Sequence, residues 1–292
     1  MTATARLEQL ADRDPAVAPL ARLLAVAFRA ATDRAWERAV PPLDPARLRD
    51  GMPLLHGATV AVDEERIARL VLELAAVTPL PLGEGAPPRG HPERGRELLE
   101  ATITQATDRL AELADEAGVE ADALAAVGNA AALPLLQAAG RRAAPLLEEP
   151  DWEAGYCPVC AAWPTLAEMR GLERRRWLRC GRCGAGWRFR PLCCPYCGED
   201  DHRQLGYLAP RRDRDSRRAE HCDSCHGYLK SLTVLGPTAP DELSAEDLAT
   251  LELDLAALER GYGRPGAPGF PLELRVVAPE RTPARRWLAW PR

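Results

Sequence analysis

Residues 156–200 read YCPVCAAWPTLAEMRGLERRRWLRCGRCGAGWRFRPLCCPYCGED and contain three Cys-x-x-Cys pairs in succession. A fourth pair follows in the segment HCDSCHGYLK at 221–230. A two-residue spacer lets both thiolates of a pair point at one ion, and two pairs supply the four soft ligands of a tetrahedral zinc or iron site. The sequence therefore predicts two bound metal ions. Their eight expected ligands are Cys157, Cys160, Cys180, Cys183, Cys194, Cys197, Cys222 and Cys225.

The spacing of the pairs indicates which of them share an ion. The first two pairs are separated by 19 residues and the last two by 24, whereas 10 residues separate the second from the third. Consecutive pairing is therefore the prediction. An interleaved arrangement, joining first with third and second with fourth, leaves 33 and 38 residues between partners and remains the alternative.

Disulfides and a thioredoxin-like redox pair are the competing interpretations of the cysteines. The chain opens MTATARLEQLADRD, which has neither the basic nor the apolar region of a secretory signal. No run of about 18 apolar residues indicates a membrane span. We therefore expect a cytoplasmic protein, in which thiols stay reduced. A redox pair requires a strand-to-helix turn in a βαβ unit, and none of the four pairs has that context.

Other residues near the pairs are weaker candidates as ligands. Cys193 adjoins Cys194, and neighbouring residues rarely bind the same ion, so Cys193 is expected to be a buried non-ligand. His221 and His226 flank the fourth pair, but four sulfurs already complete that site. His56 and His91 have no grouped partner and are predicted to be surface residues.

The rest of the chain indicates a mostly α-helical protein in three parts. Residues 1–150 are predicted to form a helical bundle, 151–236 a double four-cysteine module resembling rubredoxin or zinc-ribbon knuckles, and 237–292 a C-terminal helix with an irregular tail packing on the rest. Apolar residues recur at helical spacing in the first part, with no strand alternation.

Several local details follow from the same patterns. Residues 93–117 are predicted to form one long helix ending at Gly118, and 121–139 a helix broken near Pro134. A capping box at Ser244 and Asp247 is expected to begin the C-terminal helix. Short alternating stretches at 176–178 and 187–190 are predicted to be β-like.

Charge gives little support to nucleic-acid binding. The chain has a net charge of −5, whereas residues 151–230 carry 15 basic and 11 acidic groups, a balance of +4. Eight thiolates around two divalent ions would contribute about −4 and neutralise that segment. A nucleic-acid-binding zinc ribbon, based on the arginines at 174–176 and 211–218, therefore remains an alternative hypothesis.

The four pairs CPVC, CGRC, CPYC and CDSC, the last continuing as HGYLK, follow an α-helical half. This arrangement resembles the formate dehydrogenase accessory proteins of the FdhE type. Further similarities are the helix PLARL at 19–23, the run DLATLELDL at 247–255 and the Gly-Tyr at 261–262. Cys193 departs from the family pattern, in which another residue type precedes the third pair.

The resemblance implies a cytoplasmic, non-catalytic maturation factor that contacts the catalytic subunit of respiratory formate dehydrogenase. It also implies iron rather than zinc in rubredoxin-like sites. No small-molecule substrate or membrane span is expected, and a rubredoxin-like electron-transfer protein is a further alternative. Exposed aromatics and arginines are favoured interface anchors, so the expected docking face lies around Trp177, Trp187 and 211–218.

Overall fold

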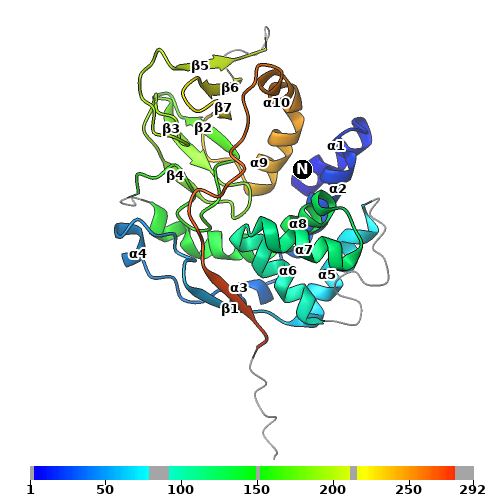
Figure 1. Ribbon diagram of the computed structural model, residues 1–292. Helices are drawn as coiled ribbons and strands as arrows, with labels where there is room; N and C mark the ends of the chain where they lie inside the picture. Colours follow the sequence, from blue (N-terminus) through cyan, green and yellow to red (C-terminus); the bar gives the residue numbers. More distant parts are fainter. Residues whose placement is uncertain (1–2, 79–91, 149–151, 211–215, 280–292) are drawn as a thin grey trace, which may run out of the picture.

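The computed structural model describes residues 3–78, 92–148, 152–210 and 216–279 (Figure 1). Helices dominate up to residue 148, where long apolar stripes pack around a central helix. The expected apolar positions Ile67, Leu70 and Leu74 are all buried. The helices of this part are α1 (Ala3–Arg13), α2 (Ala18–Ala30), α3 (Ala35–Ala39), α4 (Ala46–Arg49), α5 (Glu64–Ala76), α6 (Pro92–Thr104), α7 (Thr107–Ala117), α8 (Ala121–Ala143) and the 3-10 helix η1 (Ala144–Leu147).

Helix α8 forms the centre of the helical part. It contacts α2, α3, α5, α6 and α7, and most of its side chains are buried. The segment Ala121–Leu147 is long and apolar enough to cross a membrane by length and composition, but 78% of its most apolar window is buried inside the protein. Such burial is typical of a core helix.

A six-stranded sheet follows, with the strand order β4-β3-β2-β7-β6-β5. The predicted β-like stretch at 176–178 lies in β3 and that at 187–190 overlaps β4. The extent of the sheet corrects the mostly α fold class. The two halves meet where β2 and β7 pair in parallel, with Leu166 opposite Lys230. The strands are β2 (Leu166–Arg170), β3 (Arg175–Arg179), β4 (Gly186–Arg188), β5 (Leu205–Leu208), β6 (Arg217–Cys222) and β7 (Tyr228–Val234).

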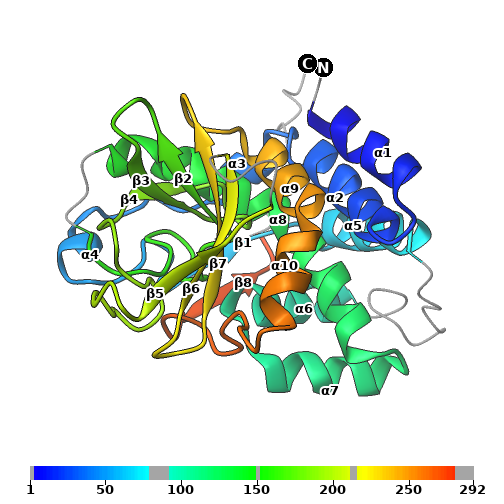
Figure 2. The same ribbon diagram turned by 90° about the horizontal axis from the view of Figure 1, so that it is seen from above.

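The two halves of the sheet repeat one design. Each half has the chain order cysteine pair, strand, strand, cysteine pair, strand, and each pairs its three strands antiparallel. Helices α9 (Pro240–Ala249) and α10 (Leu251–Leu258) then lie beside the sheet (Figure 2). Helix α10 contacts β5, β6 and β7, and so covers one face of the second half.

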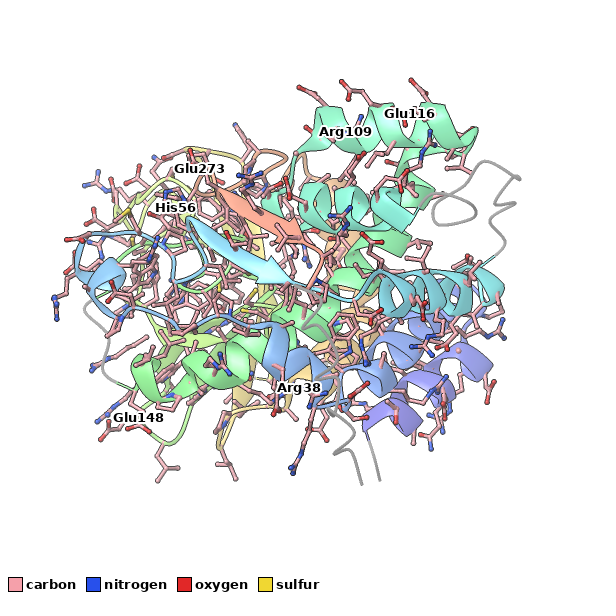
Figure 3. All side chains as sticks on the ribbon, turned by 90° about the horizontal axis from the view of Figure 1, so that it is seen from below. Arg38, His56, Arg109, Glu116, Glu148 and Glu273 are labelled. Carbon is pink, nitrogen blue, oxygen red and sulfur yellow. The ribbon has the colours of Figure 1, made fainter. Side chains whose placement is uncertain are left out.

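A second, small sheet joins the helical part to the segment that follows α10. Strand β1 (Ala58–Ala61) pairs in parallel with β8 (Leu274–Val277). Figure 3 shows His56 and Glu273 side by side where these strands begin, and the Glu273 amide donates to His56 Nδ1 at 3.2 Å. His56 is therefore half-buried rather than a free surface residue. Strand β1 corrects the prediction that the first part is purely helical, and β8 corrects the prediction that the segment after the C-terminal helix is irregular. Residues 280–292 of that segment lie outside the described residues.

Three helix predictions were wrong in detail. The long helix at 93–117 is interrupted at Gln105, which has a φ of 58°, although Gly118 ends α7 in the left-handed conformation as expected. Helix α8 continues through Pro134, because packing on several sides outweighs the roughly 3 kcal/mol that an interior proline costs. Ser244 lies inside α9, where its hydroxyl donates to the Pro240 carbonyl, so no capping box forms.

One hydrophobic core runs from the helices into the cysteine region. It contains Leu136 and Ala139 of α8 together with Cys160, Cys180 and Trp187. The apolar packing is therefore continuous across the predicted boundary at residue 150. The division of the chain into three parts at residues 150 and 236 remains a prediction.

Candidate metal centres

The four cysteine pairs adopt one backbone conformation. In each, the first cysteine's amide donates to the carbonyl five residues later, at 2.8–2.9 Å. The residue after the second cysteine is left-handed, which turns the chain around the sulfurs and is easiest for glycine. The four residues in this position are Ala161, Gly184, Gly198 and His226, with φ values of 62°, 76°, 78° and 54°.

The structure groups the first two pairs into one cluster. Cys157 Sγ lies 3.5 Å from Cys183 Sγ, and Cys160 Sγ lies 3.5 Å from Cys180 Sγ. All four sulfurs lie within 4.8 Å of one another, and all four side chains are buried. We refer to these four cysteines as the first cluster.

The first cluster is built into the helical part of the protein. A Cβ placed on Gly140 of α8 would lie 1.8 Å from the Cys183 carbonyl oxygen, so only glycine permits this approach. The Gln137 side-chain amide donates to the Arg182 carbonyl at 3.0 Å, and the Arg182 guanidinium donates to the Thr102 carbonyl at 2.6 Å. Helices α6 and α8 therefore support the second pair directly.

The last two pairs form the second cluster, defined by Cys194, Cys197, Cys222 and Cys225. Cys194 Sγ lies 3.6 Å from Cys225 Sγ, and Cys197 Sγ lies 3.7 Å from Cys222 Sγ. Here Cys194 and Cys222 are buried, whereas Cys197 and Cys225 are exposed. The grouping is thus consecutive, and the interleaved alternative does not match the geometry.

The sulfur distances fit a metal ion better than disulfides. Sulfurs bonded to a tetrahedral ion at about 2.3 Å lie about 3.8 Å apart, whereas a disulfide requires about 2.05 Å. All the closest sulfur pairs lie at 3.5–3.7 Å, and all nine cysteines are free thiols. Each cluster could therefore hold one ion through four thiolates; that these eight residues are ligands remains a prediction.

Electrostatics gives a reason for a cation at each cluster. Burial raises the pKa of the Cys157 and Cys183 thiols well above the usual value, whereas hydrogen bonds from Cys157 and Cys160 lower the pKa of Cys180. Burial also raises the pKa of Cys225, to about 11. Several neighbouring thiols in a buried site cannot all become thiolates without a compensating charge, and a divalent ion supplies that charge.

The weaker candidates occupy positions around the second cluster. Cys193 is buried, and its thiol donates to carbonyl oxygens rather than joining the cluster. His221 lies beside Asp223, with Nδ1 3.1 Å from Oδ1, and stacks on Tyr262 at 4.3 Å. His226 is exposed and has the left-handed backbone of the fourth knuckle. His91 lies outside the described residues.

A buried charge network beside the second cluster was missed by sequence reasoning. Lys230, the single lysine of the chain, is fully buried and donates to Asp254 Oδ2 at 2.5 Å and to the Asp247 carbonyl at 2.6 Å. Arg264 pairs with both aspartates, and the Tyr228 hydroxyl donates to Asp254 at 2.8 Å. A lone lysine in an arginine-rich chain was the available signal. The network fixes β7 against the junction of α9 and α10.

The proposed docking face is corrected in part. Trp187 is fully buried in the core and cannot anchor a partner, while Trp177 is half-buried beneath the Arg170 guanidinium at 4.3 Å. Arg217 pairs with Glu246 at 2.8 Å. Residues 211–215 lie outside the described residues, and Arg218 is partly exposed and lies 3.9 Å from Glu220.

Comparison with known proteins connects this geometry to one family. Residues 192–270, which include the whole second cluster, match the family described as FdhE, C-terminal domain. The chain also matches the crystal structure of the FdhE protein from Pseudomonas aeruginosa, with a TM-score of 0.55 and 28% identity over 91% of this chain and 92% of that one. The resemblance to the FdhE family is confirmed.

Two curated relatives illustrate how the sequence similarity is distributed. The FdhE homologue of Stutzerimonas stutzeri is 38% identical over 112 residues, which cover 37% of this chain and 35% of the relative. The FdhE homologue of Pseudomonas aeruginosa is 37% identical over 116 residues, 37% of each protein. The aligned part thus spans just over a third of these relatives, whereas the similarity to the FdhE crystal structure extends over nearly the whole chain.

Proposed function

We propose that this protein is a cytoplasmic accessory factor that binds the catalytic subunit of formate dehydrogenase during its maturation. The observation that carries the proposal is the match of fold to the FdhE protein over nine-tenths of both chains, with the FdhE C-terminal domain match lying on the second cluster. The protein acts by binding its client and has no turnover of its own.

In this proposal, each cluster holds one iron ion through its four cysteines, and the second cluster lies closest to the client. Support comes from the sulfur spacing and from the exposure of Cys197 and Cys225, which brings two of the four cysteines to the surface. A redox role belongs to this exposed site, since electron transfer and redox sensing require approach to the surface. The buried first cluster serves the fold.

Among the described residues, the pairing of the module's arginines does not favour nucleic-acid binding. Arg175, Arg176 and Arg179 each pair with a glutamate. Such arginines have little positive charge left for phosphates, which dominate affinity for nucleic acids.

Binding to the purified catalytic subunit tests the proposal. Biolayer interferometry with immobilised full-length protein should show saturable association at physiological salt, and the catalytic subunit should not be altered chemically. Metal analysis should find two ions per chain, with the visible absorption of ferric thiolate if both are iron. Absence of association with the catalytic subunit, together with specific retention of RNA or DNA, would overturn the proposal.

A further inference from the structure

One face of the second half-sheet is left open on the side away from α10. Strand register places Tyr207 opposite Glu220, and Glu220 opposite Leu229, on this open face. The alternate residues, such as Ala219 and Tyr228, face α10 instead. A cavity of about 300 Å³ lies over the open face. We call it the sheet groove and define it by Met169, Arg176, Leu192, Tyr207, Arg218 and Leu229.

The segment that joins the two half-sheets forms one wall of the sheet groove. Leu192 in this segment is 71% exposed and has a φ of 48°, a left-handed conformation that non-glycine residues rarely adopt. Tyr207, on β5, is 57% exposed. Two large apolar side chains therefore stand at the mouth of an apolar cavity, and one of them is held there on an unfavourable backbone.

The sheet groove holds more guanidinium groups than carboxylates among its described lining residues. Arg176 donates to Glu220 at 2.8 Å and to the Cys193 carbonyl at 2.7 Å, and it is almost fully buried. Arg218 lies 3.9 Å from the same glutamate, and its guanidinium stacks over Tyr207 at 5.3 Å. Two guanidinium groups thus share one carboxylate. Of the three guanidinium nitrogens of Arg218, only Nε has a hydrogen-bond partner within the described part of the chain, the Ser231 hydroxyl.

The position of β5 favours an extended occupant. β5 is the last strand of the six-stranded sheet as described, so its outer backbone groups face away from any partner strand. Exposed edges of this kind accept an added strand from another chain, while neighbouring cavities receive its alternate side chains. The sheet groove adjoins this edge through Leu205 and Tyr207.

We propose that the sheet groove binds an extended segment of the client polypeptide in which apolar side chains adjoin a carboxylate. The apolar side chains occupy the cavity between Leu192 and Leu229. The carboxylate pairs with the two terminal guanidinium nitrogens of Arg218, which have no hydrogen-bond partner among the described residues. The proposal rests on the proposed function for the identity of the client. It places the client within contact of Cys194 and Cys222, which also line the cavity.

Site-specific photocrosslinking tests the location. A p-benzoylphenylalanine residue at Tyr207 of the full-length protein should crosslink to the formate dehydrogenase catalytic subunit. The mapped peptide should contain apolar residues beside Asp or Glu. The same crosslinker at Leu255, which is 53% exposed on α10 behind the sheet, should give no crosslink. Crosslinking from Leu255 but not from Tyr207 would overturn the groove as the docking site.

Charge reversal tests the chemistry. Arg218→Glu should weaken binding of the catalytic subunit by about tenfold or more, as loss of an anchoring charge at an interface does. Arg188→Glu, an equal change of charge at the exposed end of β4 on the opposite edge of the sheet, should leave affinity unchanged. Equal effects of the two variants would show that only net charge matters and would overturn the groove.

Leu192→Gly separates binding from folding. Glycine removes the apolar side chain and also relieves the left-handed backbone, so the melting temperature should not fall while client affinity drops about tenfold. Unchanged affinity would overturn the proposal. Failure of the proposed function is distinguishable, because the unmodified protein would then show no association, whereas failure of the groove alone leaves that association intact in Arg218→Glu and Leu192→Gly.

Discussion

The two cysteine clusters share one knuckle design but have different surroundings. All four cysteines of the first cluster are buried, and the first cluster belongs to the same hydrophobic core as α8. In the second cluster, Cys197 and Cys225 are exposed. The adjoining strands pack against α10 and are held by the charge network around Lys230. The knuckle supplies the sulfur geometry, but the elements packed around it decide whether a cluster serves the core or the surface.

The largest expected effect comes from removing one pair of sulfurs from each cluster in turn. Cys157→Ser with Cys160→Ser should abolish one ion and cost much of the total stability, since a structural ion contributes on the order of 10 kcal/mol in small metal-dependent units. Cys194→Ser with Cys197→Ser should also abolish the binding of one ion but leave the helices folded. Metal analysis and thermal unfolding followed by circular dichroism measure both.

Each double variant is the matched control for the other. Equal losses of helix would show that the two clusters support the core alike. Loss of both ions from either variant would mean that the sites do not bind independently.

A smaller but sharper effect is expected at the contact between α8 and the first cluster. Gly140→Ala places a methyl group 1.8 Å from the Cys183 carbonyl oxygen, so the backbone of the knuckle or the helix must move. We expect a loss of about 3 kcal/mol, at the upper end for overpacking. Gly236→Ala, which meets no atom within 4 Å, is the control and should change stability little. Denaturant unfolding monitored by circular dichroism distinguishes them.

Next in size is the buried carboxylate that joins β2 to β3. Glu168 accepts hydrogen bonds from Arg179 at 2.6 Å, from Arg170 at 2.6 Å and from the Thr238 amide at 3.0 Å. Burial raises its pKa, but the two guanidinium groups outweigh this and hold the pKa below the ordinary value of 4.5. We expect Glu168→Gln to cost about 2 kcal/mol at pH 7, because a charged hydrogen-bonded pair is lost.

The sign of the pH dependence follows from this lowered pKa. The native carboxylate contributes its full stabilisation above the ordinary value of 4.5, and that contribution is lost as the pH falls through the lower native value. The difference in free energy of unfolding between wild type and Glu168→Gln should therefore shrink below pH 4.5. A constant difference down to pH 3 would contradict the proposed source of stability.

How much the sequence could predict depended on how local each feature is. A Cys-x-x-Cys pair defines its own turn, so the knuckles and their consecutive grouping followed from spacing alone. The parallel pairing of Leu166 with Lys230 joins residues far apart in the chain, as does that of Ala58 with Leu274. No short-range pattern specifies such partners, and the sheet was therefore underestimated.

Burial depth was equally inaccessible from the motifs. Cys157 and Cys194 begin similar pairs, each followed by proline, yet only the first pair packs against the helical core. The difference arises because α8 presents Gly140 to the first cluster, and nothing in either motif records that contact. Interruption at Gln105 and continuity at Pro134 were likewise decided by tertiary packing rather than by helix propensity.

The smallest expected effect compares the left-handed position of two knuckles in the second cluster. Gly198 and His226 follow the second cysteine of their pairs with φ values of 78° and 54°, and His226 is exposed. A non-glycine residue costs roughly 1 kcal/mol in this conformation, so His226→Gly should raise the free energy of unfolding by about that amount. Gly198→Ala should lower it similarly, since its added methyl group meets no atom within 4 Å. Denaturant unfolding of the metal-loaded protein measures both, and a loss of stability in His226→Gly would show that contact with Tyr262 outweighs the backbone cost.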